Sequence, residues 1–396
     1  MRIAFYAPLK PPASAVPSGD RRMARLLLQA LAMAGHEAEL ASSLRMHDPT
    51  GDGLRQAELA AEAEAEAARL LASYKARPEA RPQAWLTYHV YHKAPDIIGP
   101  LVASALDLPY LIAEPSVAGK RRSGPWADGF ARAAAAIARA DMLLCLTRHD
   151  MQGVATIARQ ERLRLLPPFL DHRPFAAARA AADGGAGRPA VRAALAARYG
   201  LDPARAWLLA VGMFRAGDKL ESYRRLAAAL ARLEAAVPPW QLLVAGAGPA
   251  EAEVRAALAL LASPVAWLGQ VAEADLPALY AASDLYVWPA ANEAYGMALL
   301  EAAAAGCPVV SCATRGVPDV VWQGETGLLV EEDRPAALAG AISALLQDAP
   351  RRRRMGAAAA ARVAEDRSLA AASRRLDAAL ADAVAHRAAA DAAGTG

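Results

Sequence analysis

The sequence predicts an α/β fold with two doubly wound, Rossmann-like domains. Short apolar segments alternate with helical segments in both halves of the chain, a pattern that requires right-handed crossovers and a mostly parallel sheet. The length of 396 residues exceeds the usual size of one domain. Pro167-Pro168 and a stretch rich in Gly, Ala and Arg at about 182–188 separate the halves, which places the domain boundary near residues 171–200.

The first half opens as strand, helix and strand. Ile3–Tyr6 predicts the first strand, residues 19–34 a helix, and residues 35–40 the second strand. The run rich in Ala and Glu at 57–71 predicts an exposed helix rather than an acidic binding patch. Further strands are expected at later apolar segments, namely 84–88, 110–113, 142–146 and 163–166.

A second alternation of strands and helices runs from Trp207 to about Leu346. Leu285–Trp288 predicts a short core strand that Pro289 closes, and Cys307–Ser311 opens the next strand, with a helix of roughly three turns between them. The predicted organisation is an N-terminal domain at 1–180, a linker at 181–200, a C-terminal domain at 201–370 and a final helix at 371–396.

The composition is typical of a soluble globular protein. A formal net charge of +3 is too small an excess to indicate nucleic-acid binding. Alanine inflates the hydrophobic share of 55%, and no uninterrupted apolar stretch reaches about 18 residues. The first residues run directly into a strand without the pattern of a secretory signal, so a cytoplasmic location is expected. Cys145, Cys307 and Cys312 lie in apolar segments without metal-ligand spacing and are expected to be buried thiols.

The most informative segment is Asn292–Glu301, where two glutamates bracket the predicted start of a helix. The amides in the first turn of a helix have no partners within the helix, and the helix dipole adds about half a positive charge there. Residues 295–297 are therefore expected to bind a diphosphate. Glu293 and Glu301 accept hydrogen bonds when ionised, which suits hydroxyl-rich rings. Two glutamates at this spacing are also common on solvated helix faces, so the pair alone does not decide the function.

The segment from Pro289 to Leu329 resembles the donor-binding half of the retaining glycosyltransferases of family 4, whose signature is a Glu, seven residues and a second Glu. The resemblance covers roughly residues 207–345 and includes Leu208–Gly212, Leu242–Pro249, Trp267–Val271, Thr314–Pro318 and Gly324–Leu329. It implies the GT-B architecture, in which two doubly wound domains face a cleft. It also implies a last helix that crosses back onto the first domain.

The resemblance implies roles for individual residues. Glu293 would contact the transferred sugar, and Glu301 would contact the nucleotide ribose. Further donor contacts are expected at the helix start and in the base-binding segment, at Ala294, Tyr295, Gly296, Met297, Gln270 and Val271. The family is described without an obligatory metal. We therefore expect no metal site and no cofactor apart from the nucleoside diphosphate sugar, which is a substrate.

Fixed positive groups are needed where the departing diphosphate gains negative charge. Arg215 and Lys219 follow Gly212, and we assign them catalytic roles beside Glu293. The family usually has an arginine directly after this glycine. Met213 stands in that place here, so Arg215 would compensate from two positions further on. Capping or decorating the next helix is the alternative role for both cations.

The first domain offers a glycine where the family approaches the phosphates. Pro17-Ser18-Gly19-Asp20 stands where the family usually carries a glycine pair before its first helix. Gly19 would bring amides toward the donor phosphates. Asp20 would alternatively make this segment a simple helix cap, and both interpretations are open.

Polar residues on the acceptor side are expected after two strands. His89, His92 and Lys93 follow the strand that ends at Tyr88, and the carboxyl ends of parallel strands border ligand crevices. The family often has a histidine after the next strand. Glu114 stands there in this chain and would orient an acceptor hydroxyl or a neighbouring cation.

Two basic runs raise the question of anionic partners. Lys120–Arg122 lies in a loop, where an acidic acceptor or peripheral contact with anionic lipid are both open. Arg351–Arg354 lies in a helical segment and is better interpreted as a solvated helix face.

The sequence-based hypothesis is transfer of a sugar from a nucleoside diphosphate sugar to an acceptor hydroxyl, with retained anomeric configuration. The acceptor would be a glycan, a lipid-linked molecule or a small molecule. The alternatives are a nucleotide-sugar epimerase of the same architecture and a catalytically inactive nucleotide-sugar-binding protein, which Met213 and Glu114 favour. A dehydrogenase is disfavoured because Gly246–Glu251 lacks the third glycine of the dinucleotide fingerprint.

Overall fold

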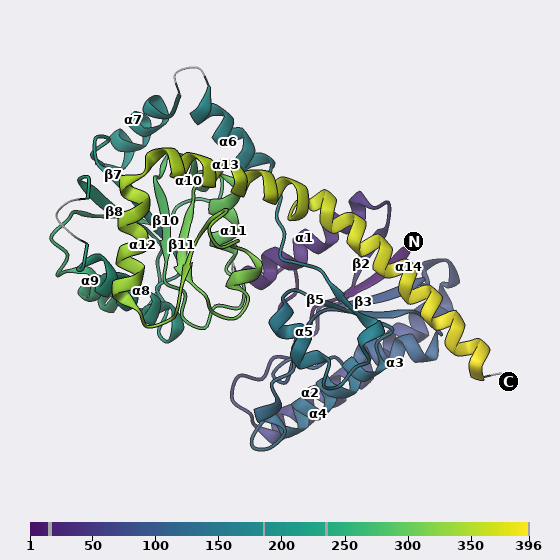
Figure 1. Cartoon of the computed structure of the whole chain (residues 1–396). Helices are drawn as coiled ribbons and strands as arrows, with labels where there is room; N and C mark the ends of the chain where they lie inside the picture. Colours follow the sequence, from purple (N-terminus) through teal and green to yellow (C-terminus); the bar gives the residue numbers. More distant parts are fainter. Residues whose placement is uncertain (15–17, 185–186, 234–236, 395–396) are drawn as a thin grey trace. The chain divides into compact units, whose positions relative to one another are not determined.

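The computed structural model describes residues 1–14, 18–184, 187–233 and 237–394, with side chains described as far as residue 389 (Figure 1). The chain divides into two compact units. Unit 1 comprises Met1–Pro167 and Leu369–Gly396, and unit 2 comprises Pro168–Ser368. Each unit contains its own sheet of six parallel strands surrounded by helices. The predicted α/β class with two doubly wound domains is confirmed.

The sheet of unit 1 has the strand order β2-β1-β3-β4-β5-β6. Its strands are β1 Arg2–Tyr6, β2 Glu37–Ser42, β3 Ala84–Val90, β4 Tyr110–Pro115, β5 Met142–Cys145 and β6 Leu163–Leu165. The central strands β3, β4 and β5 are apolar and buried along almost their whole length, because helices cover both faces of a doubly wound sheet. The edge strand β2 instead exposes Glu37 and Glu39.

The helices of unit 1 are α1 Gly19–Met33, α2 Gly53–Ala76, α3 Ile98–Ala105, α4 Ala127–Arg139, α5 Arg148–Val154 and α14 Leu369–Gly394, with 3-10 turns η1 Pro78–Ala80, η2 Gly119–Arg121 and η3 Gln160–Arg162. The last helix, α14, packs against α1 and reaches β4 and β5 (Figure 1). Leu376 and Leu380 are buried in this contact. The C-terminal helix is therefore an integral part of unit 1.

The sheet of unit 2 has the strand order β12-β11-β10-β7-β8-β9. Its strands are β7 Ala206–Val211, β8 Trp240–Ala245, β9 Val265–Gly269, β10 Leu285–Trp288, β11 Val309–Cys312 and β12 Gly327–Val330. Its helices are α6 Arg173–Asp183, α7 Gly187–Tyr199, α8 Asp218–Leu230, α9 Glu251–Leu258, α10 Leu276–Ala282, α11 Met297–Ala304, α12 Pro335–Gln347 and α13 Ala349–Asp366, with the 3-10 turn η4 Val317–Asp319. Helices α8, α9 and α12 pack together, and α6, α10 and α11 form a second packed group (Figure 1).

The segment predicted as a linker, residues 181–200, is largely helical. Helix α7 fills most of it, and positions 185–186 lie outside the described residues. Arg192 on α7 places its guanidinium 3.9 Å from the ring centroid of Trp207 and donates to Asp284 at 3.0 Å. These contacts fix α7 onto the core of unit 2. The Ala and Arg composition that suggested a flexible link is that of a helix with one buried face.

The boundary between the units lies at Pro167/Pro168 rather than at residue 180. Helix α6, which was assigned to the first domain, packs against α10 of unit 2. The Phe175 ring of α6 lies 6.3 Å from the Tyr280 ring, and both side chains are buried. Burial of Phe175 therefore assigns α6 to unit 2.

Each sheet has one point where the strand order changes direction. It lies between β1 and β3 in unit 1 and between β7 and β10 in unit 2. Ligands of doubly wound sheets bind outside the carboxyl ends of the strands at such a point. A ligand site is therefore expected among the residues that follow β1 and β3 in unit 1. In unit 2 it is expected among those that follow β7 and β10.

The three cysteines are buried and form no disulfide, as the sequence predicts. Burial raises the pKa of Cys145 to about 12, and it raises the pKa of Cys312 to about 11. These thiols are therefore protonated at neutral pH and serve as apolar packing groups.

Candidate functional site

The loop after β10 turns sharply before α11. Asn292 and Gly296 have positive φ angles of 49° and 72°. A Cβ atom at Gly296 would lie 2.7 Å from Leu299 Cδ1, so this position needs glycine for both conformation and space. No described side chain caps α11. Leu299 N donates to Gly296 O at 3.0 Å, so the amides of Met297 and Ala298 are the ones at the helix start that lack a partner within the helix.

Helix α11 is shorter than the sequence suggests. It spans eight residues, about two turns rather than the predicted three. The chain leaves the helix at Ala305 and Gly306, and Gly306 has a φ of 73°. A left-handed glycine just past the last turn is a common helix stop.

Lys219 and Glu293 form an ion pair at the carboxyl ends of β7 and β10. Lys219 Nζ donates to Glu293 Oε2 at 2.6 Å, and the side chains are 21% and 16% exposed. Trp288 Nε1 donates to the same oxygen at 3.2 Å, and its ring centroid lies 5.3 Å from the Lys219 ammonium. Glu293 is thus held by donors from two elements. The pair uses one of the three ammonium donors of Lys219, so two remain for another anion.

A second polar network lies on the same edge of the sheet. Arg315 donates to Asn292 Oδ1 at 3.0 Å, and Asn292 Nδ2 donates to Asp218 Oδ2 at 2.9 Å. These three residues follow β11, β10 and β7 respectively, and their side chains are exposed. The network ties three neighbouring loops together and leaves a guanidinium at the rim.

Glycines fix the path of the loop after β7. A Cβ atom at Gly246 would lie 1.9 Å from the carbonyl oxygen of Gly212, and one at Gly248 would lie 2.2 Å from that of Phe214. The close approach lets Phe214 N donate to Ala247 O at 3.0 Å. The loops after β7 and β8 therefore pack as one rigid layer beneath the ion pair.

Among the predicted cations, only Lys219 contacts Glu293. Arg215 is exposed and forms no ion pair with a described residue, and Met213 is 46% exposed. Lys219 contacts Glu293 because it lies in the first turn of α8, immediately after the Gly217 N-cap. The role of Arg215 stays a prediction.

The remaining donor-side residues lie at different depths. Glu301 is 4% exposed, and the Tyr280 hydroxyl donates to its Oε2 at 3.0 Å. Ala294 and Gln270 are exposed, whereas Tyr295, Met297 and Val271 are half-buried. The predicted ribose and base contacts of Glu301, Gln270 and Val271 stay predictions. The burial of Glu301 means that a ligand would meet it at one edge of its carboxylate.

Unit 1 has a carboxylate, imidazole and carboxylate array at its own switch point. His89 Nδ1 lies 2.9 Å from Asp20 Oδ1 and 3.7 Å from Glu114 Oε1. His89 and Glu114 are the penultimate residues of β3 and β4, and Asp20 lies in the first turn of α1. His89 and Glu114 have positive φ angles of 62° and 58°, which are strained for these residue types. We call these three residues the His89 triad.

The charges of the His89 triad perturb one another. Burial alone would lower the pKa of His89, but Glu114 and Asp20 outweigh it and raise this pKa to about 9. Burial raises the pKa of Glu114 to about 7 against the opposing charge of His89. Burial also acts to raise the pKa of Asp20, but its hydrogen bond to His89 lowers it overall. At neutral pH the imidazole is therefore a cation.

The structure excludes Asp20 as the cap of α1. Ser18 is the N-cap of α1 and accepts from Arg21 N at 3.2 Å, so Asp20 is not the cap. A Cβ atom at Gly19 would meet no described atom within 4 Å, so packing does not require this glycine. Pro17 lies outside the described residues.

His92 and Lys93, which were predicted to join His89, instead face Trp126. The Lys93 ammonium lies 4.5 Å from the centroid of the Trp126 ring, and the His92 ring centroid lies 6.0 Å from it. These residues form a separate cluster because the chain turns after β3, where Tyr91 and Ala94 pair.

Two further features bear on the class of site. No helix in the described part of the chain is both long and apolar enough to span a membrane. Across the described ranges, no group of three or more His, Cys, Asp or Glu side chains is arranged to hold a metal ion.

A family comparison places the ion pair within a known module. The model for glycosyl transferases group 1 matches residues 209–362, which include Lys219, Glu293 and α11. The alpha-D-kanosaminyltransferase of Streptomyces kanamyceticus is 31% identical over 283 residues, which cover 70% of this chain and 69% of that protein. The chain belongs to the glycosyl transferases of group 1.

Other group 1 relatives match over shorter stretches. The D-inositol 3-phosphate glycosyltransferase of Nocardia farcinica is 31% identical over 58% of this chain and 50% of its own length. The relative from Corynebacterium glutamicum with the same name is 44% identical over 21% of this chain and 20% of its own length. The chain thus spans between about a fifth and a half of the length of these curated relatives.

Solved structures show the same fold as this group 1 chain. A sucrose-phosphate synthase from Thermosynechococcus elongatus has a TM-score of 0.70 at 21% identity and covers 95% of this chain and 97% of its own. An Anabaena protein in complex with UDP-glucose has a TM-score of 0.68 at 17% identity and covers 96% of this chain and 99% of its own. The GT-B type of fold is confirmed.

Sequence reasoning missed several polar partners in this group 1 chain. Trp288 was interpreted as a core strand residue, yet its indole N–H holds Glu293. Asn292 and Arg315 were noted only as parts of matching segments, and they form the rim network. A signal for Asn292 existed, because a polar residue directly before the first glutamate favours a left-handed turn. No comparable signal pointed to Trp288.

Proposed function

We propose that this group 1 protein transfers a sugar from a nucleoside diphosphate sugar to an acceptor hydroxyl with retention of anomeric configuration. The proposal makes it a family 4 enzyme, with Glu293 and Glu301 as the two glutamates of the motif. The observation that carries it is the 2.6 Å contact between Lys219 and Glu293 beside the uncapped start of α11. A cation and a carboxylate at a switch point match a donor that is anionic at one end and rich in hydroxyls at the other.

The names of related proteins support this choice of substrate. The Streptomyces kanamyceticus relative is a kanosaminyltransferase, and the Anabaena structure holds UDP-glucose. Both names concern sugar transfer or a nucleotide sugar. They favour a transferase over an epimerase, which would need no acceptor.

The chemistry assigns each described group a task. The sugar C1–oxygen bond to the diphosphate breaks, a new C1–oxygen bond to the acceptor forms, and the acceptor proton passes to the leaving phosphate oxygen. Lys219 and the amides at the start of α11 stabilise the charge on that oxygen, and Glu293 accepts from sugar hydroxyls. A cation about 4 Å from the phosphate contributes about 4 kcal/mol at an effective dielectric of about 20, before desolvation is subtracted.

A panel of nucleotide sugars tests the proposal through thermal shift and nucleotide release. Lys219→Ala should lower kcat by about 10²–10³-fold, the usual effect of losing one group that stabilises the transition state. Glu301→Ala should weaken donor binding, and Lys75→Ala, an exposed lysine on α2, serves as the matched control. Unchanged donor affinity and turnover in both Lys219→Ala and Glu301→Ala would contradict the proposed site.

A binding protein without turnover is the second candidate. It is favoured by Met213, which stands where the family has an arginine. Tight binding of a nucleotide sugar, without nucleotide release in the presence of an acceptor panel, would support this candidate. A change of sugar configuration without any acceptor would instead indicate an epimerase.

A further inference from the structure

Unit 1 gathers cations around one tryptophan. The Trp126 cluster consists of His92, Lys93, Lys120, Arg121 and Trp126. The Lys93 ammonium and the Arg121 guanidinium carbon lie 4.5 Å and 4.7 Å from the Trp126 ring centroid. Its members follow β3 and β4 or precede α4, so they meet at the carboxyl edge of the sheet. Ligands of this fold bind at that edge.

The positive charge of the Trp126 cluster is unbalanced. No ion pair joins Lys93, Lys120 or Arg121 to a carboxylate in the described ranges. The nearby Asp128 is paired with Arg132 at 2.7 Å. The cluster therefore has like charges at close range and no internal counter-ion.

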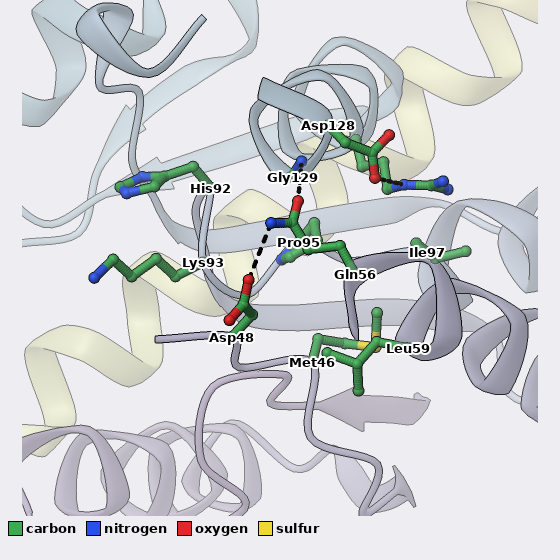
Figure 2. Close-up of a pocket in the computed structure, with 11 residues that line it drawn as sticks. Met46, Asp48, Gln56, Leu59, His92, Lys93, Pro95, Ile97, Asp128 and Gly129 are labelled. Atoms are coloured by element: carbon green, nitrogen blue, oxygen red, sulfur yellow. Dashed lines mark hydrogen bonds and ion pairs between the residues drawn. The ribbon is translucent and has the colours of Figure 1, made fainter. Parts of the chain in front are cut away.

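The other nearby carboxylate, Asp48, is already satisfied by neutral donors. Its two oxygens accept from the amides of Thr50 and Gly51 at 2.8 and 2.9 Å and from Gln56 Nε2 at 3.0 Å. Figure 2 shows Gln56 bridging Asp48 and Gly129, while the Lys93 side chain extends away from the Asp48 carboxylate. Asp48 thus holds the loop through neutral donors and forms no ion pair with Lys93, and its negative charge stays beside the cluster.

The excess charge acts on His92. Burial, together with the charges of Arg121, Lys93 and Lys120, lowers the pKa of His92 to about 4. His92 Nδ1 and Arg121 Nε are buried without a hydrogen-bond partner among the described residues. Buried polar atoms of this kind usually have a partner. Arg121 Nε can only donate, so it points to a missing acceptor, whereas Nδ1 of the neutral His92 ring donates or accepts according to the tautomer.

A small cavity lies beside the Trp126 cluster between His92, Lys93 and Asp48. Its volume is about 10 Å³, which is room for about one water molecule. Trp126 and Arg121 do not line this cavity, so a larger ligand group would lie over the cluster rather than inside it. The Lys93 ammonium and the Arg121 guanidinium donate charge-assisted hydrogen bonds of the kind that bind phosphate oxygens.

The Trp126 cluster is connected to the His89 triad by a row of rings. The centroids of His89 and Tyr91, of Tyr91 and His92, and of His92 and Trp126 lie 5.0, 5.2 and 6.0 Å apart. A molecule with an anion on the cluster would extend along this row toward His89 and Glu114. Both groups lie in unit 1, so this geometry belongs to one compact body.

We propose that the Trp126 cluster binds the phosphate group of a phosphorylated acceptor. The identification of this ligand as the acceptor rests on the proposed function, whereas the oxyanion site does not. The acceptor class is thereby narrowed to a small phosphate monoester that carries free hydroxyl groups.

The first test measures binding of inorganic phosphate and of a hexose monophosphate to the full chain by calorimetry, with the free hexose and matched sodium chloride as references. The Lys93→Ala/Arg121→Ala double variant should bind the hexose monophosphate at least about tenfold more weakly, because it removes two charge-assisted contacts to the phosphate. Lys75→Ala, at an exposed lysine on α2, is the control. Equal affinity in the parent and the double variant would overturn the proposal.

The second test follows the His92 imidazole by NMR, with His92→Gln to assign its signal. Bound phosphate should raise the pKa of His92 by about one unit or more, since a nearby opposite charge favours the protonated ring. This readout distinguishes a specific site from general screening, because sodium chloride at equal ionic strength should reproduce only a small part of the shift. An unchanged His92 pKa at saturating phosphate would also overturn the proposal.

Two further arms separate the sources of the phosphate and the two proposals. The protein could co-sediment with phosphatidylglycerol vesicles but not with phosphatidylcholine vesicles, and fail to bind the hexose monophosphate. That result would assign the cluster to anionic lipid and refute the acceptor proposal. If the cluster binds the hexose monophosphate but no nucleotide sugar is turned over, the oxyanion site stands and the proposed function fails. If the parent turns over an unphosphorylated acceptor and the double variant has the same KM for that acceptor, the claim that the acceptor is phosphorylated is refuted. The oxyanion site itself would not be refuted by this result.

Discussion

Replacing Asp20 by Asn tests whether the His89 triad is an interacting charge array. In the parent protein His89 Nδ1 lies 2.9 Å from Asp20 Oδ1. Asparagine keeps a side-chain oxygen at this position but removes the negative charge. The pKa of His89 should therefore fall from about 9 toward its ordinary value, with Glu114 still holding part of the shift. His89→Gln removes the titrating ring, and Asp107→Asn, at an exposed carboxylate bonded to Arg387, is the control.

The size of the effect follows from the difference between the folded and unfolded pKa values. A histidine whose pKa rises from 6.5 to about 9 on folding adds about 3 kcal/mol of stability, fully present below pH 6.5 and lost as pH rises through 9. The contribution of His89 to the free energy of unfolding should fall by about 2 kcal/mol from pH 7.5 to pH 9.5. This window lies above the pKa values of Glu114 and His92, which are about 7 and about 4. Burial raises the pKa values of Cys145, Cys307 and Cys312, so these thiols add a further loss of stability in the same window, equally in the parent and in each variant.

Two measurements check this prediction. NMR titration of the His89 ring gives the pKa in the parent and in Asp20→Asn, and urea unfolding between pH 7.5 and pH 9.5 gives the stability. The slope should be smaller in Asp20→Asn than in the parent and smaller still in His89→Gln, where only the share of the buried thiols remains, whereas Asp107→Asn should follow the parent. A parent protein with no loss of stability in this window, or an Asp20→Asn variant with the parent's His89 pKa, would refute the reasoning.

Three further substitutions test the packing and polar contacts of unit 2. Trp288→Phe keeps an aromatic ring but removes the 3.2 Å bond to Glu293, so nucleotide release from the donor should slow by roughly tenfold. Because Trp288 is buried and phenylalanine is smaller, the melting temperature should also fall; an unchanged rate of nucleotide release would exclude the role of the indole N–H. Gly246→Ala should destabilise the protein by about 1–3 kcal/mol in urea because its Cβ would meet Gly212 O, whereas Gly340→Ala, with open space around it, should not. Asp284→Asn should cost about 3–5 kcal/mol because this carboxylate holds Arg192 at 3.0 Å and Trp207 N at 2.8 Å. A loss as small as that of Asp275→Asn, at a partly exposed ion pair, would contradict its role as a buried ion-pair centre.

The sequence by itself determined the secondary structure and fold class, because periodicity and turn residues act locally. The strands expected at 3–6 and 142–146 are observed at Arg2–Tyr6 and Met142–Cys145. The predicted linker was wrong for a nonlocal reason. The residues of α7 form a helix with one buried face, and only its partner Trp207 shows that the face is occupied.

Only the tertiary structure decided which side chains meet. Lys219 and Glu293 are 74 positions apart, and Asp20 and His89 are 69 apart, yet each pair is within hydrogen-bonding distance. The sequence offered Arg215 and Lys219 as comparable cations, and the turn at Gly217 brings only Lys219 to Glu293. Parallel strands collect the residues that follow their carboxyl ends at one edge of the sheet, and the order of the strands, which sequence spacing does not encode, selects the neighbours.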